Sequence, residues 1–205
     1  MDSYLLDANV FITAKNQHYR FDFCTGFWSW IEDCHAKELV YSVSKVKKEL
    51  QNADKFDLAR KWAEQMPPSF FLPDESEAHV MANYAKLMNW ANENAQYMQK
   101  AKDEFALGTN ADAFLIARAI TDGRVIVSHE TQKQPDVKAR IPIPNAANAF
   151  GVKVISIFDL LSGHANPTFQ LHMPNKITLM PTKGAVPQVS MNDAGGASEL
   201  PTSSV

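Results

Sequence analysis

The chain has 205 residues, of which 45% are hydrophobic and 21% charged, and its formal net charge is −3. This composition predicts one globular domain of ordinary size with a substantial core. It excludes a protein that grips nucleic acid through bulk positive charge, so any nucleic-acid binding needs a local basic patch. We expect neither a signal peptide nor a membrane helix, and the two cysteines without metal-ligand spacing indicate a reduced, cytoplasmic protein.

The first predicted element is a short buried strand that ends in an acid. Residues 4–6 are apolar or aromatic, Asp7 follows them, and Asn9 is placed to cap a helix over residues 10–16. An aspartate after a strand is often only part of a turn. Its role therefore depends on whether other acids reach the same edge of the sheet.

Strands and helices then alternate along the chain. The other predicted strands cover residues 39–43, 124–127 and 153–157, and the other predicted helices cover residues 26–36, 45–66, 73–107, 111–121, 144–150 and 158–161. Ser44 is placed to cap the helix that follows it, and residues 109–110 open the helix over residues 111–121. The order predicts an α/β fold, with a mostly parallel sheet of four or more strands flanked by helices and a helical insertion at about 73–107.

The chain divides by composition at about residue 163. Residues 1–163 hold all the predicted elements, whereas residues 164–205 contain five prolines and end in a Gly-, Ser- and Thr-rich sequence. Such a segment cannot build a core of its own, so we predict an extended or disordered tail. Its middle, residues 176–180, could alternatively add to a sheet edge or dock on a partner.

Four acids that lie far apart in the sequence are predicted to converge. Asp7 ends the first strand, Glu49 and Asp112 lie near the starts of their helices, and Glu130 follows the third predicted strand. In a parallel sheet with returning helices, all four positions lie at the carboxyl edge of the strands. Each acid alone has an ordinary structural explanation, but four like charges in one place repel each other unless a cation neutralises them.

The kind of donor points to a hard cation. Carboxylate oxygens without histidine or cysteine partners favour Mg²⁺ or Mn²⁺ over Zn²⁺. His129 is adjacent to Glu130 in the sequence. We interpret it as facing the substrate or supporting the ligands, because neighbouring side chains point in different directions.

The segments around these acids resemble the PIN-domain family, the nuclease fold of many bacterial VapC-like toxins. The resemblance covers residues 1 to 162 and rests on residues 5–10, 46–50, 111–117, 125–130 and 150–161. The chain departs from the common pattern at one position, since many members have aspartate where Glu130 stands. Glutamate still supplies a carboxylate, on a longer side chain.

The resemblance implies a metal-dependent endoribonuclease that hydrolyses RNA phosphodiester bonds with Mg²⁺ or Mn²⁺. Asp7, Glu49 and Asp112 would hold the first cation, and Glu130 would bind it through water or help to hold a second. The protein would be the toxin of a toxin–antitoxin pair, with a cognate antitoxin at the site and a possible homodimer.

The same resemblance assigns supporting residues. Asn9 and Ser128 would orient the carboxylates or the attacking water. Lys45, Lys48 and Lys133 would contact the phosphates of the RNA, although a lysine at such a position is often only solvated.

Two alternatives stay open at this point. A phosphatase of the haloacid dehalogenase type would use Asp7 as its nucleophile, but it needs a second acid two positions later, where this chain has Asn9. A noncatalytic PIN-like module that binds RNA or protein would not need the complete set of acids.

Overall fold

The computed structural model describes residues 2–166. Within this range, one parallel sheet has the strand order β3-β2-β1-β4-β5. Its strands are β1 (Tyr4–Leu6), β2 (Val40–Val43), β3 (Phe71–Leu72), β4 (Val125–Val127) and β5 (Val154–Ile155). The predicted α/β class is confirmed, and β3 is an additional strand where we expected only a lead-in to a helix.

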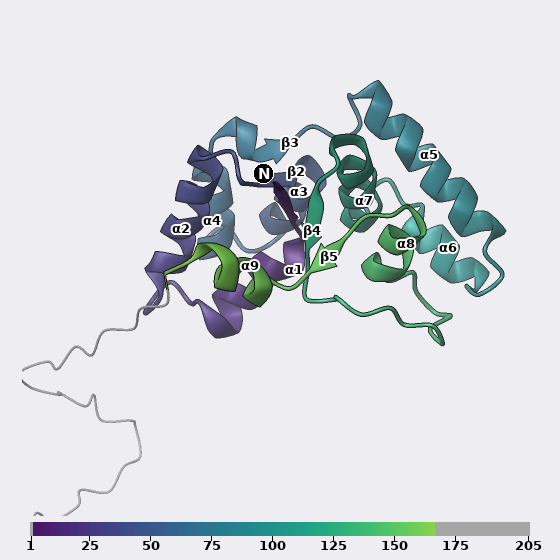
Figure 1. Cartoon of the computed structure of the whole chain (residues 1–205). Coiled ribbons are helices and arrows are strands. Elements are labelled where there is room, and N and C mark those ends of the chain that lie inside the picture. Colours follow the sequence, from purple (N-terminus) through teal and green to yellow (C-terminus); the bar gives the residue numbers. More distant parts are fainter. Residues whose placement is uncertain (1, 167–205) are drawn as a thin grey trace, which may run out of the picture. The chain divides into compact units, whose positions relative to one another are not determined.

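Helices cover both faces of the sheet (Figure 1). One group, with α2 and α4, lies on one side, and another, with α5, α7 and α8, lies on the other. Helix α7 packs against β2 and β4, and α5 packs on α7. The helices are α1 (Ala8–Thr13), α2 (Thr25–Ala36), α3 (Ser44–Gln51), α4 (Leu58–Gln65), α5 (Ala78–Glu93), α6 (Gln99–Phe105), α7 (Ala111–Asp122), α8 (Ile143–Ala149) and α9 (Ile157–His164), with a π-helical turn η1 (Ala14–His18) and a 3₁₀ turn η2 (Pro68–Phe70).

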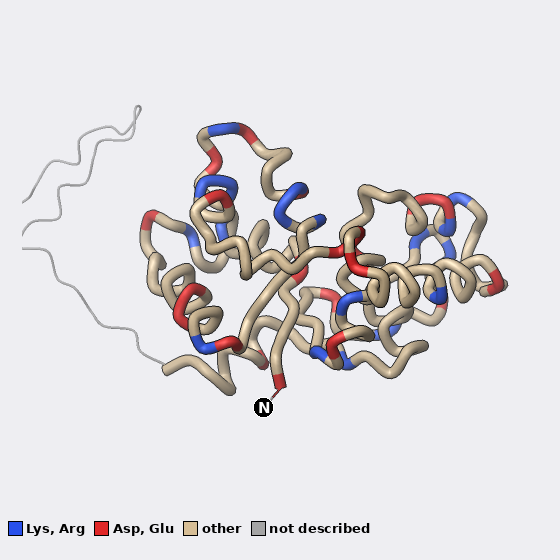
Figure 2. The backbone as a smooth tube through the Cα atoms, turned by 90° about the horizontal axis from the view of Figure 1, so that it is seen from above, with Lys and Arg blue, Asp and Glu red and all other residues tan. Residues whose placement is uncertain are grey.

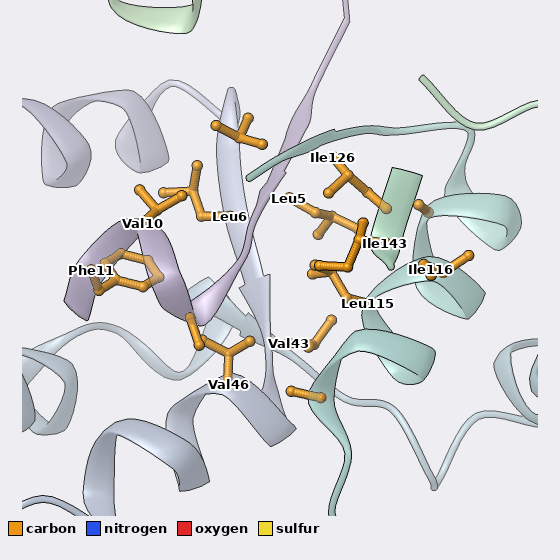
Figure 3. Close-up of a cluster of buried hydrophobic side chains, with 14 of the residues drawn as sticks. Leu5, Leu6, Val10, Phe11, Val43, Val46, Leu115, Ile116, Ile126 and Ile143 are labelled. Carbon is orange, nitrogen blue, oxygen red and sulfur yellow. The ribbon is translucent and has the colours of Figure 1, made fainter. Parts of the chain in front are cut away.

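The hydrophobic core lies on both faces of the central strand. In Figure 3, Leu5 lies with Leu115 and Ile143 on one side of β1, and Leu6 lies with Val10 on the other side. All five side chains are at most 2% exposed. A strand buried on both faces has no polar alternation, which is why β1 and β4 are short continuous apolar runs.

The long helix predicted over residues 45–66 is wrong, because two helices occupy this range. Helix α3 ends at Gln51 and α4 begins at Leu58. Between them the Asp54 carboxylate accepts a hydrogen bond from the Phe56 backbone N–H, and the Asp57 carboxylate accepts one from Arg60 N at the start of α4. Aspartates that bond nearby backbone groups in this way compete with helix continuation and begin a new helix.

Both predicted helix caps are wrong. The α1 helix begins after Asp7, and Asn9 lies exposed in its first turn. Ser44 is the first residue of α3, and its hydroxyl donates to the Leu72 carbonyl, which ties α3 to β3. Asn110 caps α7, because its side-chain oxygen accepts hydrogen bonds from the backbone N–H groups of Asp112 and Ala113.

The predicted arm at 73–107 consists of α5 and α6, and its first helix begins at Ala78 rather than at Pro73. The predicted tail begins at His164, which is the last residue of α9, and residues 167–205 lie outside the described residues. In the part that the structure describes, no helix is long and apolar enough to cross a membrane.

Candidate active site

The parallel register brings the ends of β1 and β4 side by side. Leu6 pairs with Val127, so Asp7 and Ser128 are the next residues at the carboxyl edge of the two strands. The Asp7 backbone N–H donates to the Val127 carbonyl over 3.0 Å. The short, fully paired strands thereby fix the backbone from which the first carboxylate projects.

Ser128 connects the first acid to the last. Its hydroxyl donates to Asp7 Oδ2 over 2.9 Å, and its oxygen accepts a hydrogen bond from the Glu130 backbone N–H over 3.1 Å. Asp7 is 1% exposed and Ser128 is fully buried. This contact fits the orienting role predicted for Ser128, because it holds the Asp7 carboxylate in one position.

The electrostatics of the site place the four acids near one another. Burial, followed by the charges of Asp7, Glu49 and Glu130, raises the pKa of Asp112 from 3.8 to about 7. Burial raises the pKa of Asp7 to about 6; the Ser128 hydroxyl opposes this shift and the charge of Glu49 adds to it. The convergence of carboxylates predicted from the sequence is therefore present in the structure.

Glu49 occupies the outer part of this cluster. Glu49 lies on α3 and is an exposed residue. Partial burial of its carboxyl group nevertheless raises its pKa. Its charge in turn raises the pKa of both buried aspartates.

Glu130 has an arginine partner that the sequence analysis missed. Arg140 Nη1 forms an ion pair with Glu130 Oε1, and Arg140 Nη2 donates to Gln134 Oε1 over 3.2 Å. The positive charge of Arg140 also opposes, in part, the rise in the pKa of Asp112. Arg140 lies in the loop between β4 and α8, where no periodic pattern indicates which residue turns back toward the acids.

The donor set fits a hard divalent cation by its chemistry. Among residues 2–166, no group of three or more His, Cys, Asp or Glu side chains is arranged as a metal-binding set. The available donors are nevertheless carboxylate oxygens, and the charges of neighbouring acids raise the pKa of Asp7 and of Asp112. Within the described residues, the buried Glu130 Oε2 has no hydrogen-bond partner. Such oxygens favour Mg²⁺ or Mn²⁺.

The three lysines predicted to contact phosphate differ in their surroundings. Lys45 is 6% exposed, and its Nζ lies 2.6 Å from Glu75 Oε1 and 4.7 Å from the centre of the Phe114 ring. These contacts favour a structural role for Lys45 over the predicted phosphate contact. Lys48 and Lys133 are exposed.

An aromatic trio includes the residue next to Glu130. It consists of His18 at the end of η1, His129 between Ser128 and Glu130, and Phe158 in the first turn of α9. The ring centre of His129 lies 6.4 Å from the ring centre of His18 and 6.5 Å from that of Phe158. The ring centres of His18 and Phe158 are 5.7 Å apart. Burial, followed by the nearby His18, lowers the pKa of His129.

A cavity of about 590 Å³ lies elsewhere, lined in part by His35, Tyr41 and Ser69, and none of the four acids lines it. There His35 Nδ1 lies 3.1 Å from the Val40 carbonyl oxygen and His35 Nε2 lies 2.9 Å from Ser69 Oγ. These hydrogen bonds connect α2 with β2 and η2. We assign them a structural role.

Replacing Ser128 with alanine should raise the pKa of Asp7 above about 6, because the carboxylate loses its side-chain hydrogen-bond donor. A hydrogen bond to a charged group contributes ~1.5–3 kcal/mol, so the free energy of unfolding at pH 8 should fall by about that amount. Carboxyl-carbon NMR across pH and urea denaturation would measure the two effects. An unchanged Asp7 pKa would contradict the proposed orienting contact.

The model of a family described as "Domain of unknown function (DUF4411)" matches residues 4–167. No curated protein matches the chain. The crystal structure of VapBC2 from Rickettsia felis bound to a DNA fragment from their promoter is similar, with 16% sequence identity and a TM-score of 0.44, over 75% of this chain and 97% of that chain. A likeness at this level carries no information about activity.

Proposed function

The chain belongs to the DUF4411 family, which is PIN-like at the level of the fold, and from this premise we propose that it is a metal-dependent endoribonuclease. The proposed reaction is hydrolysis of RNA phosphodiester bonds with Mg²⁺ or Mn²⁺. The proposal rests above all on Asp112, whose pKa is raised to about 7 by burial and by three surrounding carboxylates.

A buried cluster of like charges destabilises a folded protein unless a cation neutralises it. Asp7 and Asp112 each have a pKa two units or more above the usual value of 3.8, and both lie at the carboxyl edge of a parallel sheet. Ligands of α/β sheets bind at this edge, and perturbed carboxylates gather at functional sites. A cation-binding role explains why the acids stand together.

In the proposed site Asp7, Glu49 and Asp112 hold the cation, and Glu130 assists directly or through water. The cation supplies a Lewis acid that neutralises the carboxylates and the scissile phosphate. Ser128 keeps Asp7 oriented, and the exposed Asn9 in the first turn of α1 is available to position water or substrate.

Contacts with the RNA backbone must be local. Figure 2 shows acidic and basic residues interspersed over the described chain rather than separated onto two sides. The exposed Lys48, next to Glu49, and Lys133, in the loop after Glu130, are the proposed phosphate contacts. With a net charge of −3, the protein does not attract RNA through its overall charge. The cation at the site must therefore supply much of the attraction to the phosphates.

We extend the proposal to the biological setting. The protein would be the toxin of a toxin–antitoxin pair, with a cognate antitoxin that covers the acids, and it could act as a homodimer. These statements rest on the PIN-like family alone.

Purified protein should cleave single-stranded RNA when Mg²⁺ or Mn²⁺ is added, and EDTA should abolish cleavage, because the clustered acids need a cation to accept a phosphate. Gel analysis of an end-labelled RNA, with and without chelator, would measure this. Cleavage that survives EDTA would refute the proposed mechanism. RNA binding without cleavage under any divalent cation would favour the noncatalytic alternative.

A further inference from the structure

The aromatic trio of His18, His129 and Phe158 is exposed beyond the needs of the core. Phe158 is 48% exposed, whereas its neighbours Ile157 and Leu160 on α9 are buried and supply the contacts that dock the helix. Figure 1 shows α9 beside the segment of α1, which η1 continues. The rings of the trio, whose centres are 5.7 to 6.5 Å apart, lie where these segments meet. The packing of α9 therefore does not require a phenylalanine at position 158.

The backbone connects this trio directly to the acids. His129 is the residue between Ser128, which bonds Asp7, and Glu130, so a ligand that contacts the His129 ring touches the chain between two residues of the proposed site. His18 ends the π-helical turn η1, and such turns occur frequently at functional sites. The three rings thus come from three segments, and one of these segments also carries Ser128 and Glu130.

The chemistry of these rings indicates what they can bind. The exposed phenyl ring of Phe158 is uncharged, which favours contact with the face of a base over contact with the phosphate backbone. Aromatic side chains stack on any nucleobase, because every base has a π-face. A base can reach them only when it is not paired and stacked in a duplex.

We infer that His18, His129 and Phe158 form a stacking site for an unpaired RNA base next to the scissile phosphate. The inference rests on the proposed nuclease function and adds to it a subsite that binds one base of the single-stranded substrate. The trio selects the substrate by access to a base face, and the acids carry out the cleavage.

The test uses binding, so that it does not depend on cleavage. In the Asp112→Asn background with Ca²⁺, a single-stranded RNA containing 2-aminopurine should bind with quenched fluorescence. Adding Phe158→Ala should weaken binding about tenfold or more and abolish the quenching, as loss of one stacked base does elsewhere. Phe158→Tyr should restore both, and fully paired RNA should bind weakly with no effect of Phe158→Ala.

Phe56→Ala is the matched control, because Phe56 is 69% exposed but lies outside the trio. Equal binding by Phe158→Ala and the parent, or an equal loss with Phe56→Ala, would overturn the inference. In the enzyme with Asp112 intact, Phe158→Ala should raise KM and leave kcat nearly unchanged. If no RNA is cleaved but Phe158-dependent quenching persists, the nuclease proposal fails and the stacking site stands.

Discussion

Asp112→Asn should lower kcat/KM for RNA cleavage by about 10³-fold or more while the protein stays folded. Asn110 caps α7 through the backbone N–H groups of Asp112 and Ala113, so the amide side chain leaves the helix start intact. What is lost is one carboxylate of the proposed cation site. A bound cation is worth several kcal/mol of charge stabilisation, and ~1.4 kcal/mol corresponds to a factor of ten in rate.

The matched control is Asp33→Asn, which neutralises an exposed aspartate on α2. It should leave kcat/KM within about twofold of the parental value, because α2 carries none of the four acids. Steady-state rates at saturating Mg²⁺ or Mn²⁺, together with circular dichroism of each variant, would separate catalysis from folding. Cleavage by folded Asp112→Asn at the parental rate would exclude Asp112 from the mechanism.

The position of the acids followed from the sequence because it depends on topology. Short apolar strands followed by helices favour a parallel sheet, and the residues that follow the strands lie at its carboxyl edge. This argument places Asp7 and Glu130, and Asp112 is placed by its position in the first turn of the helix that returns to β4. The same residues carry the resemblance to the PIN-domain family, and the chain matches the DUF4411 family over residues 4–167.

The features that were missed depend on contacts rather than patterns. Strand β3 has only two residues, too few for any periodicity, and it is defined by its pairing with β2. The ion pair of Arg140 with Glu130 depends on the path of the loop between β4 and α8, which no sequence pattern predicts. The break before α4 was detectable, since Asp54 and Asp57 both carry the signals of a turn and a cap.

The aromatic trio could not be predicted because its members come from three distant segments. His129 was singled out for its place next to Glu130, and the interpretation that it faces the substrate stays a prediction. Its neighbours His18 and Phe158 become partners only because the fold brings η1 and α9 to the His129 ring.

Without a divalent cation, the protein should lose stability as the pH rises from about 4 to 8. The folded-state pKa values of Asp7 and Asp112, about 6 and about 7, exceed the ordinary value of 3.8, so the folded protein binds more protons than the unfolded chain. The favourable contribution is therefore complete below pH ~4 and is lost as the pH passes through the folded-state values. Urea denaturation in EDTA at several pH values would measure the decline.

Millimolar Mg²⁺ or Mn²⁺ should reverse this loss at pH 8 and raise Tm there, but it should have little effect at pH 5, where protons already neutralise the buried acids. Asp112→Asn should stabilise the EDTA-treated protein at pH 8 by roughly 2–4 kcal/mol, because one pKa unit corresponds to ~1.4 kcal/mol. The same variant should lose most of the cation-dependent rise in Tm. A ligand of a cation site should destabilise the cation-free protein and be necessary for cleavage, and Asp112 is expected to do both. A variant that proves both less stable and insensitive to cation would instead assign Asp112 a structural role.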